Sequence, residues 1–206
     1  MSPEVLKKAL AHLKKDEQLC EVIKKYPTPE IGRGGDTFEA LCRSIIYQQL
    51  SGKAARTIHE RFLELFPKKK PTPTLVLKRH RDSLRAAGLS NQKTDYLYDL
   101  ARHFNESLID PSQFPELSDE EIRRELVSVK GIGVWTADMF LMFTLGRPNV
   151  LPTLDLGIKK GFQRLFKLRA LPDEKKMQKL AKDWHPYCTV ASWYLWRLAD
   201  EGNKNR

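Results

Sequence analysis

Apolar residues recur along most of the chain at the three- and four-residue spacing that is typical of amphipathic helices. In residues 118–128, for example, this stripe contains Ile122 and Leu126. The periodicity predicts helices over roughly 2–25, 36–49, 54–66, 74–86, 91–108, 118–128, 133–145, 156–166, 173–183 and 187–200. Only residues 149–153 have an extended character, and they are too few to build a sheet. We therefore expect an all-α fold of about ten helices.

Polar residues that cap helices support several of these predicted starts. Asp36 precedes one segment and has a glutamate three residues further on, and Ser118 with Glu121 has the same capping-box spacing. Ser51 can cap the segment that starts near Ala54. Each of these starts is therefore predicted by two independent signals, the apolar periodicity and the cap.

The predicted connections are short, so consecutive helices should pack against one another. We expect two helical lobes, a central lobe formed by residues 34–130 and a second lobe formed by residues 1–33 with 131–206. A cleft between two such lobes is a usual place for a site.

Charge and cysteine content narrow the class of protein. The 206 residues include 36 Lys and Arg against 26 Asp and Glu, a net charge of +10. Such a surplus favours a polyanionic partner such as nucleic acid, although a generally basic surface would give the same count. No apolar run approaches the ~20 residues of a membrane helix, and the first residues lack the apolar stretch of a signal peptide. The three scattered cysteines are typical of a reducing compartment and are too few for a four-cysteine zinc or iron–sulfur site. We expect an intracellular protein that does not enter membranes.

Two glycines, Gly131 and Gly133, separate the predicted helices 118–128 and 133–145. Glycines allow a close approach of the backbone to a ligand, and the amides at the start of the second helix form an anion site. On a basic chain the expected anion is a phosphate of nucleic acid. Asp155 comes just before the predicted helix 156–166, where it would cap the helix in any protein.

Together these segments resemble a known family. Residues 129–137, Val-Lys-Gly-Ile-Gly-Val-Trp-Thr-Ala, followed by Asp155 are similar to the helix–hairpin–helix DNA glycosylase superfamily. The blocks that resemble its alkylpurine (3-methyladenine) branch are residues 133–141, 145–152, 155–161 and 192–196, and the upstream block 45–55 also resembles the family. The similarity extends over about residues 30–200.

The resemblance implies a monofunctional enzyme of base excision repair. Such an enzyme flips an alkylated purine, of the 3-methyladenine or 7-methylguanine type, out of the duplex and hydrolyses its N-glycosidic bond to leave an abasic site. By resemblance Asp155 is the catalytic residue, because a carboxylate can stabilise a positive, oxocarbenium-like sugar or orient a water. Leu154 replaces a residue that is often acidic in this branch. Trp135 occupies the position at which bifunctional relatives carry a nucleophilic lysine.

The base pocket is expected to contain Trp135, Met139 and Trp196, because alkylated purines are cationic and gain from contact with indole faces. Core packing is the alternative for the tryptophans. Trp184 and Trp193 are expected in the core, and Asp138 is expected to pair with a basic residue rather than to act in catalysis.

The resemblance also implies a set of DNA contacts. Gln49 or Leu50 is expected to fill the gap left by the flipped base, with Leu89 as its partner on the opposite strand, and ordinary helix termination is the alternative for these positions. The whole set of candidate DNA-binding residues is Gln48, Gln49, Leu50, Ser51, Lys53, Leu89, Lys93, Lys130, Gly131, Gly133 and Thr136. Cys188 stands where relatives often carry arginine, so no role follows for it.

The remaining implications concern ions and partners. Backbone carbonyls of Val127, Val129 and Gly131 match those that hold a monovalent cation, Na⁺ or K⁺, in relatives, and no other cofactor or iron–sulfur cluster is expected. The implied partner is double-stranded DNA that contains alkylated bases. We expect a monomer located in the cytoplasm, or in the nucleus where the cell has one.

Two other functions remain open at this point. A non-catalytic module could use the hairpin only to bind damaged DNA, and a glycosylase could prefer deaminated or oxidised bases. The tryptophan pocket and the missing lysine argue against the lyases that act on oxidised bases. The order of preference among 3-methyladenine, 7-methylguanine, hypoxanthine and ethenoadenine does not follow from the residues.

Overall fold

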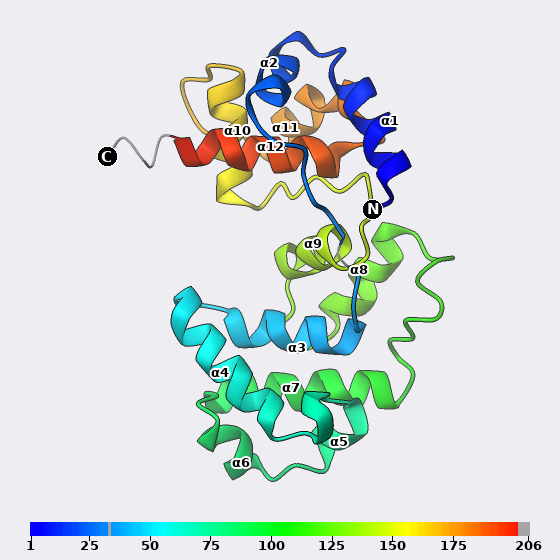
Figure 1. Cartoon of the computed structure of the whole chain (residues 1–206), viewed down its shortest axis with the longest axis vertical. Coiled ribbons are helices and arrows are strands. Elements are labelled where there is room, and N and C mark those ends of the chain that lie inside the picture. Colours follow the sequence, from blue (N-terminus) through cyan, green and yellow to red (C-terminus); the bar gives the residue numbers. More distant parts are fainter. Residues whose placement is uncertain (33, 202–206) are drawn as a thin grey trace. The chain divides into compact units, whose positions relative to one another are not determined.

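The computed structural model describes residues 1–32 and 34–201, and all regular secondary structure in these residues is helical (Figure 1). The all-α fold class is therefore confirmed. The described part of the chain contains α1 (Pro3–Leu13), α2 (Glu17–Lys25), α3 (Thr37–Tyr47), α4 (Gly52–Glu64), α5 (Pro73–Leu77), α6 (Arg81–Ala86), α7 (Asn91–Asn105), α8 (Asp119–Val127), α9 (Val134–Phe143), α10 (Leu156–Leu165), α11 (Glu174–Leu180) and α12 (Cys188–Glu201), with two 3-10 helices, η1 (Pro67–Lys69) and η2 (Lys182–Trp184). None of these helices has the length and apolar composition that a membrane crossing needs.

Two predicted helices are each divided in the structure. The segment 2–25 breaks after Leu13, because the Asp16 carboxylate caps α2 by accepting a hydrogen bond from Leu19 N at 2.9 Å. The segment 74–86 breaks between α5 and α6, where His80 has extended backbone and serves as the N-cap of α6. Apolar periodicity continues across both breaks, so the periodicity alone predicted single helices.

By internal contacts the chain divides into two compact units. Unit 1 comprises the described residues of Met1–Gly34 and Leu141–Arg206, and unit 2 comprises Gly35–Phe140. The predicted boundary between the lobes lies after residue 130. The boundary between the two units lies after Phe140, so unit 2 contains the whole glycine hairpin. Contacts within unit 2 explain the difference. Arg123 on α8 donates to Asp138 on α9 at 2.9 Å, and Phe140 makes an edge contact with Phe114.

The core of unit 1 forms around α10 and α12, which pack closely together. Gly161 on α10 makes this approach possible, since a Cβ there would lie 2.6 Å from the carbonyl oxygen of Leu195. Trp184 is fully buried and stacks on Phe162 with ring centroids 5.1 Å apart, which confirms its predicted place in the core. Its indole N–H donates to Asp16 Oδ2 at 2.8 Å, so its polar atom is satisfied.

In unit 2, α3 and α7 run side by side, and α4 and α5 also pack against this pair (Figure 1). Leu41 and Ile45 on α3, and Leu97 and Leu100 on α7, are fully buried in the core of this unit. Burial of such side chains contributes roughly 1.5–3 kcal/mol each. This packing fixes α7, and side chains of α7 contact the segments that follow α3 and α8.

Candidate DNA-binding and catalytic sites

The hairpin, residues 128–133 between α8 and α9, depends on one of its two glycines for its own shape. Gly131 has φ +84°, and a Cβ there would lie 2.1 Å from the ring of Tyr96. Gly133 differs, because a Cβ there would meet no protein atom within 4 Å. Gly131 is thus required by the fold, whereas the space beside Gly133 is open to a ligand.

The hairpin ends at the start of α9, and a side chain of α7 binds its backbone. The amide of Lys130 donates to Asp99 Oδ2 at 2.8 Å, while the Lys130 side chain is exposed. The first intrahelical bond of α9 runs from Ala137 N to Gly133 O at 3.0 Å. The amides that precede it form the positive end of the helix dipole, an arrangement that binds anions.

The wedge segment, residues 48–51, connects α3 to α4. Gln49 has φ +56°, an uncommon value for a residue with a side chain, and Gln49, Leu50 and Ser51 are all exposed. Leu50 leaves 39% of its surface exposed, which is high for leucine. The Gln48 side chain instead turns toward the hairpin, because its Nε2 donates to Gly131 O at 2.8 Å. The chain thus has an exposed leucine where a plug was predicted, and its insertion into DNA stays a prediction.

Three of the candidate DNA-binding residues lie differently from the prediction. Leu89 is only 1% exposed and packs inside unit 2, since burial of leucine is favourable, so in this conformation it offers no side chain to an opposite strand. Thr136 is also buried, which leaves only its backbone for a phosphate. Lys93 is partly buried, and its Nζ donates to Ile46 O at 2.6 Å and to Gln48 O at 2.7 Å. Lys53, in contrast, is exposed at the start of α4.

The carbonyls predicted to hold a monovalent cation already accept hydrogen bonds at two of three positions. Gly131 O accepts from Gln48 Nε2, and Val129 O accepts from Ile132 N at 3.1 Å. A carbonyl has two lone pairs, so an ion would have to share each oxygen with a donor. Together with Val127 O, these oxygens stay a predicted cation site.

In unit 1, Asp155 lies at the N-terminus of α10, as predicted. Its Oδ1 accepts a hydrogen bond from Ile158 N at 2.9 Å and a second from the indole Nε1 of Trp196 at 2.8 Å. The first bond confirms the capping role. The second brings together two residues that were predicted for different tasks, the carboxylate and one wall of the base pocket.

Gly157, which the sequence reasoning did not select, provides the space for this contact. A Cβ at Gly157 would lie 2.7 Å from Trp196 Cδ1 and 3.0 Å from Asp155 Oδ1. Glycine is unfavourable inside a helix, and Gly157 and Gly161 recur at the four-residue spacing of one helix face. That spacing was the signal that could have indicated a close approach of α12.

Phe143 is a second candidate that the sequence reasoning missed. Its ring centroid lies 5.8 Å from that of Trp196 with a 30° angle between the planes, and 37% of Phe143 is exposed. On α9 it follows Trp135 and Met139 at successive intervals of four residues, so the three share a face of that helix. Trp135 is 45% exposed, which argues against core packing as its role.

Two further predictions concern residues next to these sites. Asp138 pairs with Arg123, as expected, and is buried at 3% exposure. Burial raises the pKa of Asp138, and the neighbouring Arg123 opposes this shift. Trp193, expected in the core, is only partly buried and lies under the Arg197 guanidinium at 4.4 Å from its ring centroid. Trp193 nevertheless packs against the buried core of unit 1.

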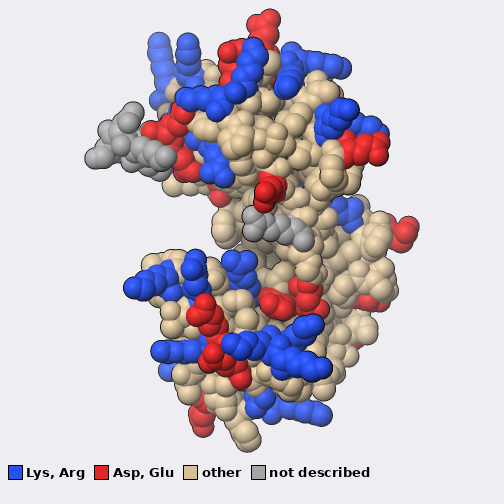
Figure 2. Space-filling model, viewed as in Figure 1, with Lys and Arg blue, Asp and Glu red and all other residues tan. Residues whose placement is uncertain are grey.

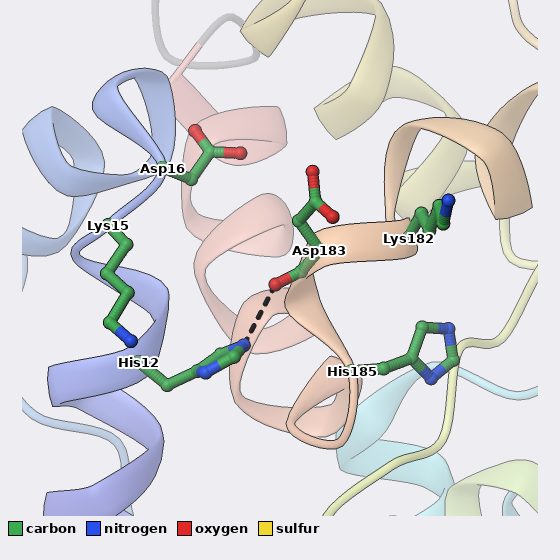
Figure 3. A pocket seen from close by; sticks show the side chains of 6 residues that line it. All are labelled: His12, Lys15, Asp16, Lys182, Asp183 and His185. Carbon is green, nitrogen blue, oxygen red and sulfur yellow. Dashed lines mark hydrogen bonds between the residues drawn. The ribbon is translucent and has the colours of Figure 1, made fainter.

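The charge of the chain is spread widely. Lys and Arg side chains are scattered over the face shown in Figure 2, with acidic side chains among them. A separate hollow of about 470 Å³ in unit 1 is lined by His12, Lys15, Asp16, Lys182, Asp183 and His185 (Figure 3). There His12 Nε2 donates to Asp183 O at 2.8 Å. None of the predicted site residues lines this hollow.

The hairpin between α8 and α9, followed by an aspartate that caps a later helix, defines a helix–hairpin–helix protein. Residues 42–186 match the model of the HhH-GPD superfamily of base excision DNA repair proteins. Because this match covers more than half of the chain, the protein belongs to that superfamily.

The chain is similar to several known proteins. YfjP of Bacillus subtilis is 36% identical over 166 residues, which are 78% of this chain but only 58% of YfjP. A Schizosaccharomyces pombe 3-methyladenine DNA glycosylase, Mag1, solved in complex with abasic DNA, is 34% identical with a TM-score of 0.78, covering 92% of this chain and 95% of that one. A DNA-3-methyladenine glycosidase from Bacillus halodurans is 33% identical with a TM-score of 0.86, covering 98% and 92%.

Proposed function

We propose that this chain is a monofunctional DNA glycosylase of base excision repair that releases alkylated purines and leaves an abasic site. The observation that carries the proposal is the Asp155 carboxylate, held by the Ile158 amide and the Trp196 indole in a member of the HhH-GPD superfamily. The names of the Mag1 and Bacillus halodurans relatives, both 3-methyladenine enzymes, support the alkylated substrate.

In the proposed mechanism, Asp155 acts on the sugar of the flipped nucleotide. Departure of the base leaves positive charge on the sugar, and a fixed carboxylate stabilises that charge or orients the attacking water. Both hydrogen bonds to Oδ1 restrict the rotation of the carboxylate before substrate arrives. The positive end of α10 favours a negative charge at this position.

Aromatic side chains are proposed to select the base. An alkylated purine is cationic, and contact with an indole face is worth about 2 kcal/mol when water is excluded. Trp135 and Met139 on α9 are proposed for such a contact, and so is Trp196, with its neighbour Phe143, in unit 1. Because the base already carries positive charge, it leaves without a general acid.

The grip on DNA is assigned to unit 2. Gly133 and the first amides of α9 are proposed to bind a phosphate. The exposed Lys130 and Lys53 are proposed as further contacts. Leu50 or Gln49 is proposed to fill the gap left by the flipped base. Double-stranded DNA with alkylated bases is the proposed partner. We further propose that the protein acts as a monomer inside the cell, without an obligatory cofactor.

A lesion panel tests this function. Duplexes that carry 3-methyladenine, 7-methylguanine, hypoxanthine or ethenoadenine are incubated with the protein, and the products are compared with and without alkali and after borohydride trapping. We expect release of alkylated purines and strand cleavage only after alkali, because Trp135 stands where the lyases carry lysine. Binding of all duplexes without base release would favour the non-catalytic damage-binding module. A covalent adduct trapped by borohydride would show that the enzyme is bifunctional.

A further inference from the structure

Three side chains on one side of α7 reach both of the segments proposed to meet DNA. Lys93, Tyr96 and Asp99 follow one another at intervals of three residues, so they project from neighbouring turns of the helix. Lys93 contacts the wedge segment, and Tyr96 and Asp99 contact the hairpin. A single rigid helix in the core of unit 2 therefore holds two separate loops.

Lys93 secures the C-terminal end of α3. The last carbonyls of a helix lack intrahelical partners, and here two of the carbonyls in this region, Ile46 O and Gln48 O, accept hydrogen bonds from the Lys93 ammonium at 2.6 and 2.7 Å. A positive charge is also favourable at the negative end of the helix dipole. Burial lowers the pKa of Lys93, in agreement with an amine withdrawn from solvent. This placement suits an internal clamp better than a contact with phosphate.

The hairpin is held from the same helix by two contacts of different kinds. Asp99 is buried, and its Oδ2 accepts the Lys130 amide at 2.8 Å, while Arg102 binds its Oδ1 at 2.5 Å. The Tyr96 ring fills the space in front of the Gly131 α-carbon, where no Cβ would fit. The hairpin cannot shift toward α7 without a clash with this ring.

Gln48 joins the two segments directly. Its backbone carbonyl accepts from Lys93, and its side-chain Nε2 donates to Gly131 O at 2.8 Å. The wedge segment and the hairpin are thus connected to each other as well as to α7. The alternating contacts form a closed set, from Lys93 through Gln48 to Gly131, and from there through Tyr96 back to α7.

We propose that Lys93 and Gln48 are positioning residues that hold the wedge segment in a fixed place relative to the hairpin. When the hairpin binds a phosphate, this connection places Gln49 and Leu50 at the base stack, so that the grip on the backbone and the insertion of the plug occur together. The proposal rests on the proposed function and deepens it, since it concerns how the same DNA is handled. It replaces the expectation that Lys93 itself binds DNA.

The test compares Lys93→Met with Lys53→Met. Both variants remove one positive charge and keep an unbranched side chain of similar length, but Lys53 is exposed and has no place in the clamp. Each protein is titrated with a duplex that carries 2-aminopurine beside a tetrahydrofuran abasic-site analogue. Affinity is measured as a function of salt, and fluorescence reports the unstacking that accompanies insertion of the plug.

For Lys93→Met we expect the slope of log affinity against log salt to stay at the wild-type value, and the fluorescence increase at saturation to fall several-fold. A phosphate contact would instead lower the magnitude of the slope by about 1 and leave the fluorescence at saturation unchanged, which would overturn the proposal. Lys53→Met should retain the full fluorescence increase. An equal loss of fluorescence in Lys53→Met would also contradict the proposal.

Gln48→Leu keeps the experiment decisive if Lys93→Met does not fold, because it removes only the bond to Gly131 and keeps a similar volume. It should reduce the fluorescence increase with an unchanged salt slope. Where Lys93→Met does fold, the effect of Gln48→Leu in the double variant should be smaller than in the wild type. Strict additivity would show that the two residues do not act through one connection. Neither readout needs bond cleavage, so these outcomes are independent of whether the wild type releases bases.

Discussion

The hairpin of unit 2 presents its backbone to a ligand, whereas the Asp155 region of unit 1 presents a side chain. The hairpin offers backbone to a ligand, and buried side chains such as Asp99 hold it from behind. The start of α10 offers a side chain, Asp155, and the Ile158 amide together with the Trp196 indole holds it. Backbone amides can bind any phosphate, whereas a carboxylate held in one orientation suits one chemical step. Changes in the first region should therefore alter affinity, and changes in the second should alter the rate of base release.

The largest expected effect comes from Asp155→Asn. Removal of the charge should slow base release by ~10²–10³-fold or more, because an amide cannot stabilise a positive sugar as a carboxylate does. Affinity for duplex DNA should stay near that of the wild type, since the proposed grip lies in unit 2. Single-turnover excision and equilibrium binding on one preparation measure both. A variant that retains more than about a tenth of wild-type excision would contradict the role of Asp155.

Gly131→Ala should have the next largest effect, and it should be on stability. The new Cβ would lie 2.1 Å from the Tyr96 ring at a φ of +84°, so overpacking and backbone strain should together cost about 3 kcal/mol of unfolding free energy. Gly133→Ala is the matched control, because its Cβ meets no protein atom. Denaturant unfolding should separate the two variants, and equal stability would mean that Tyr96 moves aside without cost.

Trp196→Phe tests the bond between the indole and Asp155. It keeps an aromatic ring beside Phe143 but removes the N–H that donates to Oδ1. A hydrogen bond to a charged group contributes about 1.5–3 kcal/mol, so the maximal excision rate should fall by ~10–100-fold with little change in affinity. If the rate is unchanged while the half-saturating DNA concentration rises, Trp196 serves only to bind the base.

Gly157→Ala, on α10, also tests the bond between Trp196 and Asp155. The added Cβ would lie 2.7 Å from Trp196 Cδ1, so the indole must shift and its bond to Asp155 should weaken. We expect a loss of excision of ~10-fold, no greater than that of Trp196→Phe, because the bond is strained rather than removed. The double variant with Trp196→Phe shows whether the two act through one contact. A fully additive loss would indicate that Gly157 acts elsewhere.

Gly133→Val should have the smallest effect, confined to DNA affinity. Its side chain meets nothing in the protein but would occupy the space proposed for a phosphate, at a cost of ~3- to 10-fold in affinity for damaged and undamaged duplexes alike. Wild-type affinity should also fall steeply with salt as counterions are released. A folded variant that loses affinity only for the damaged duplex would mean that the hairpin reads the base.

Local signals in the sequence predicted most of the helices and their caps. Asp36 accepts from Glu39 N at 2.8 Å, and Ser118 with Glu121 forms the complete capping box that its spacing predicted. These features depend on neighbours within one helical turn, which the sequence displays directly. For the same reason Asp155 was placed correctly at the start of α10.

Features that depend on distant residues were not predictable in this way. Leu89 is buried inside unit 2, and the Lys93 ammonium is held by carbonyls over forty residues away in the chain. No local pattern shows that either side chain is withdrawn from solvent. The contact of Trp196 with Asp155 joins residues far apart on α12 and α10. Only the spacing of Gly157 and Gly161 hinted that these helices approach closely.

The division of roles between the two regions is tested most directly by one measurement, a single-turnover titration of Trp196→Phe and Gly133→Val on the same alkylated duplex. Each titration gives a maximal excision rate and a half-saturating DNA concentration. We expect Trp196→Phe to lower mainly the rate, because it removes the bond to Asp155 and keeps an aromatic face for the base. We expect Gly133→Val to raise mainly the half-saturating concentration, because it disturbs the contact with phosphate. If either variant changes both quantities to a similar extent, or if the two effects are exchanged, binding and chemistry are not separated between the hairpin and Asp155.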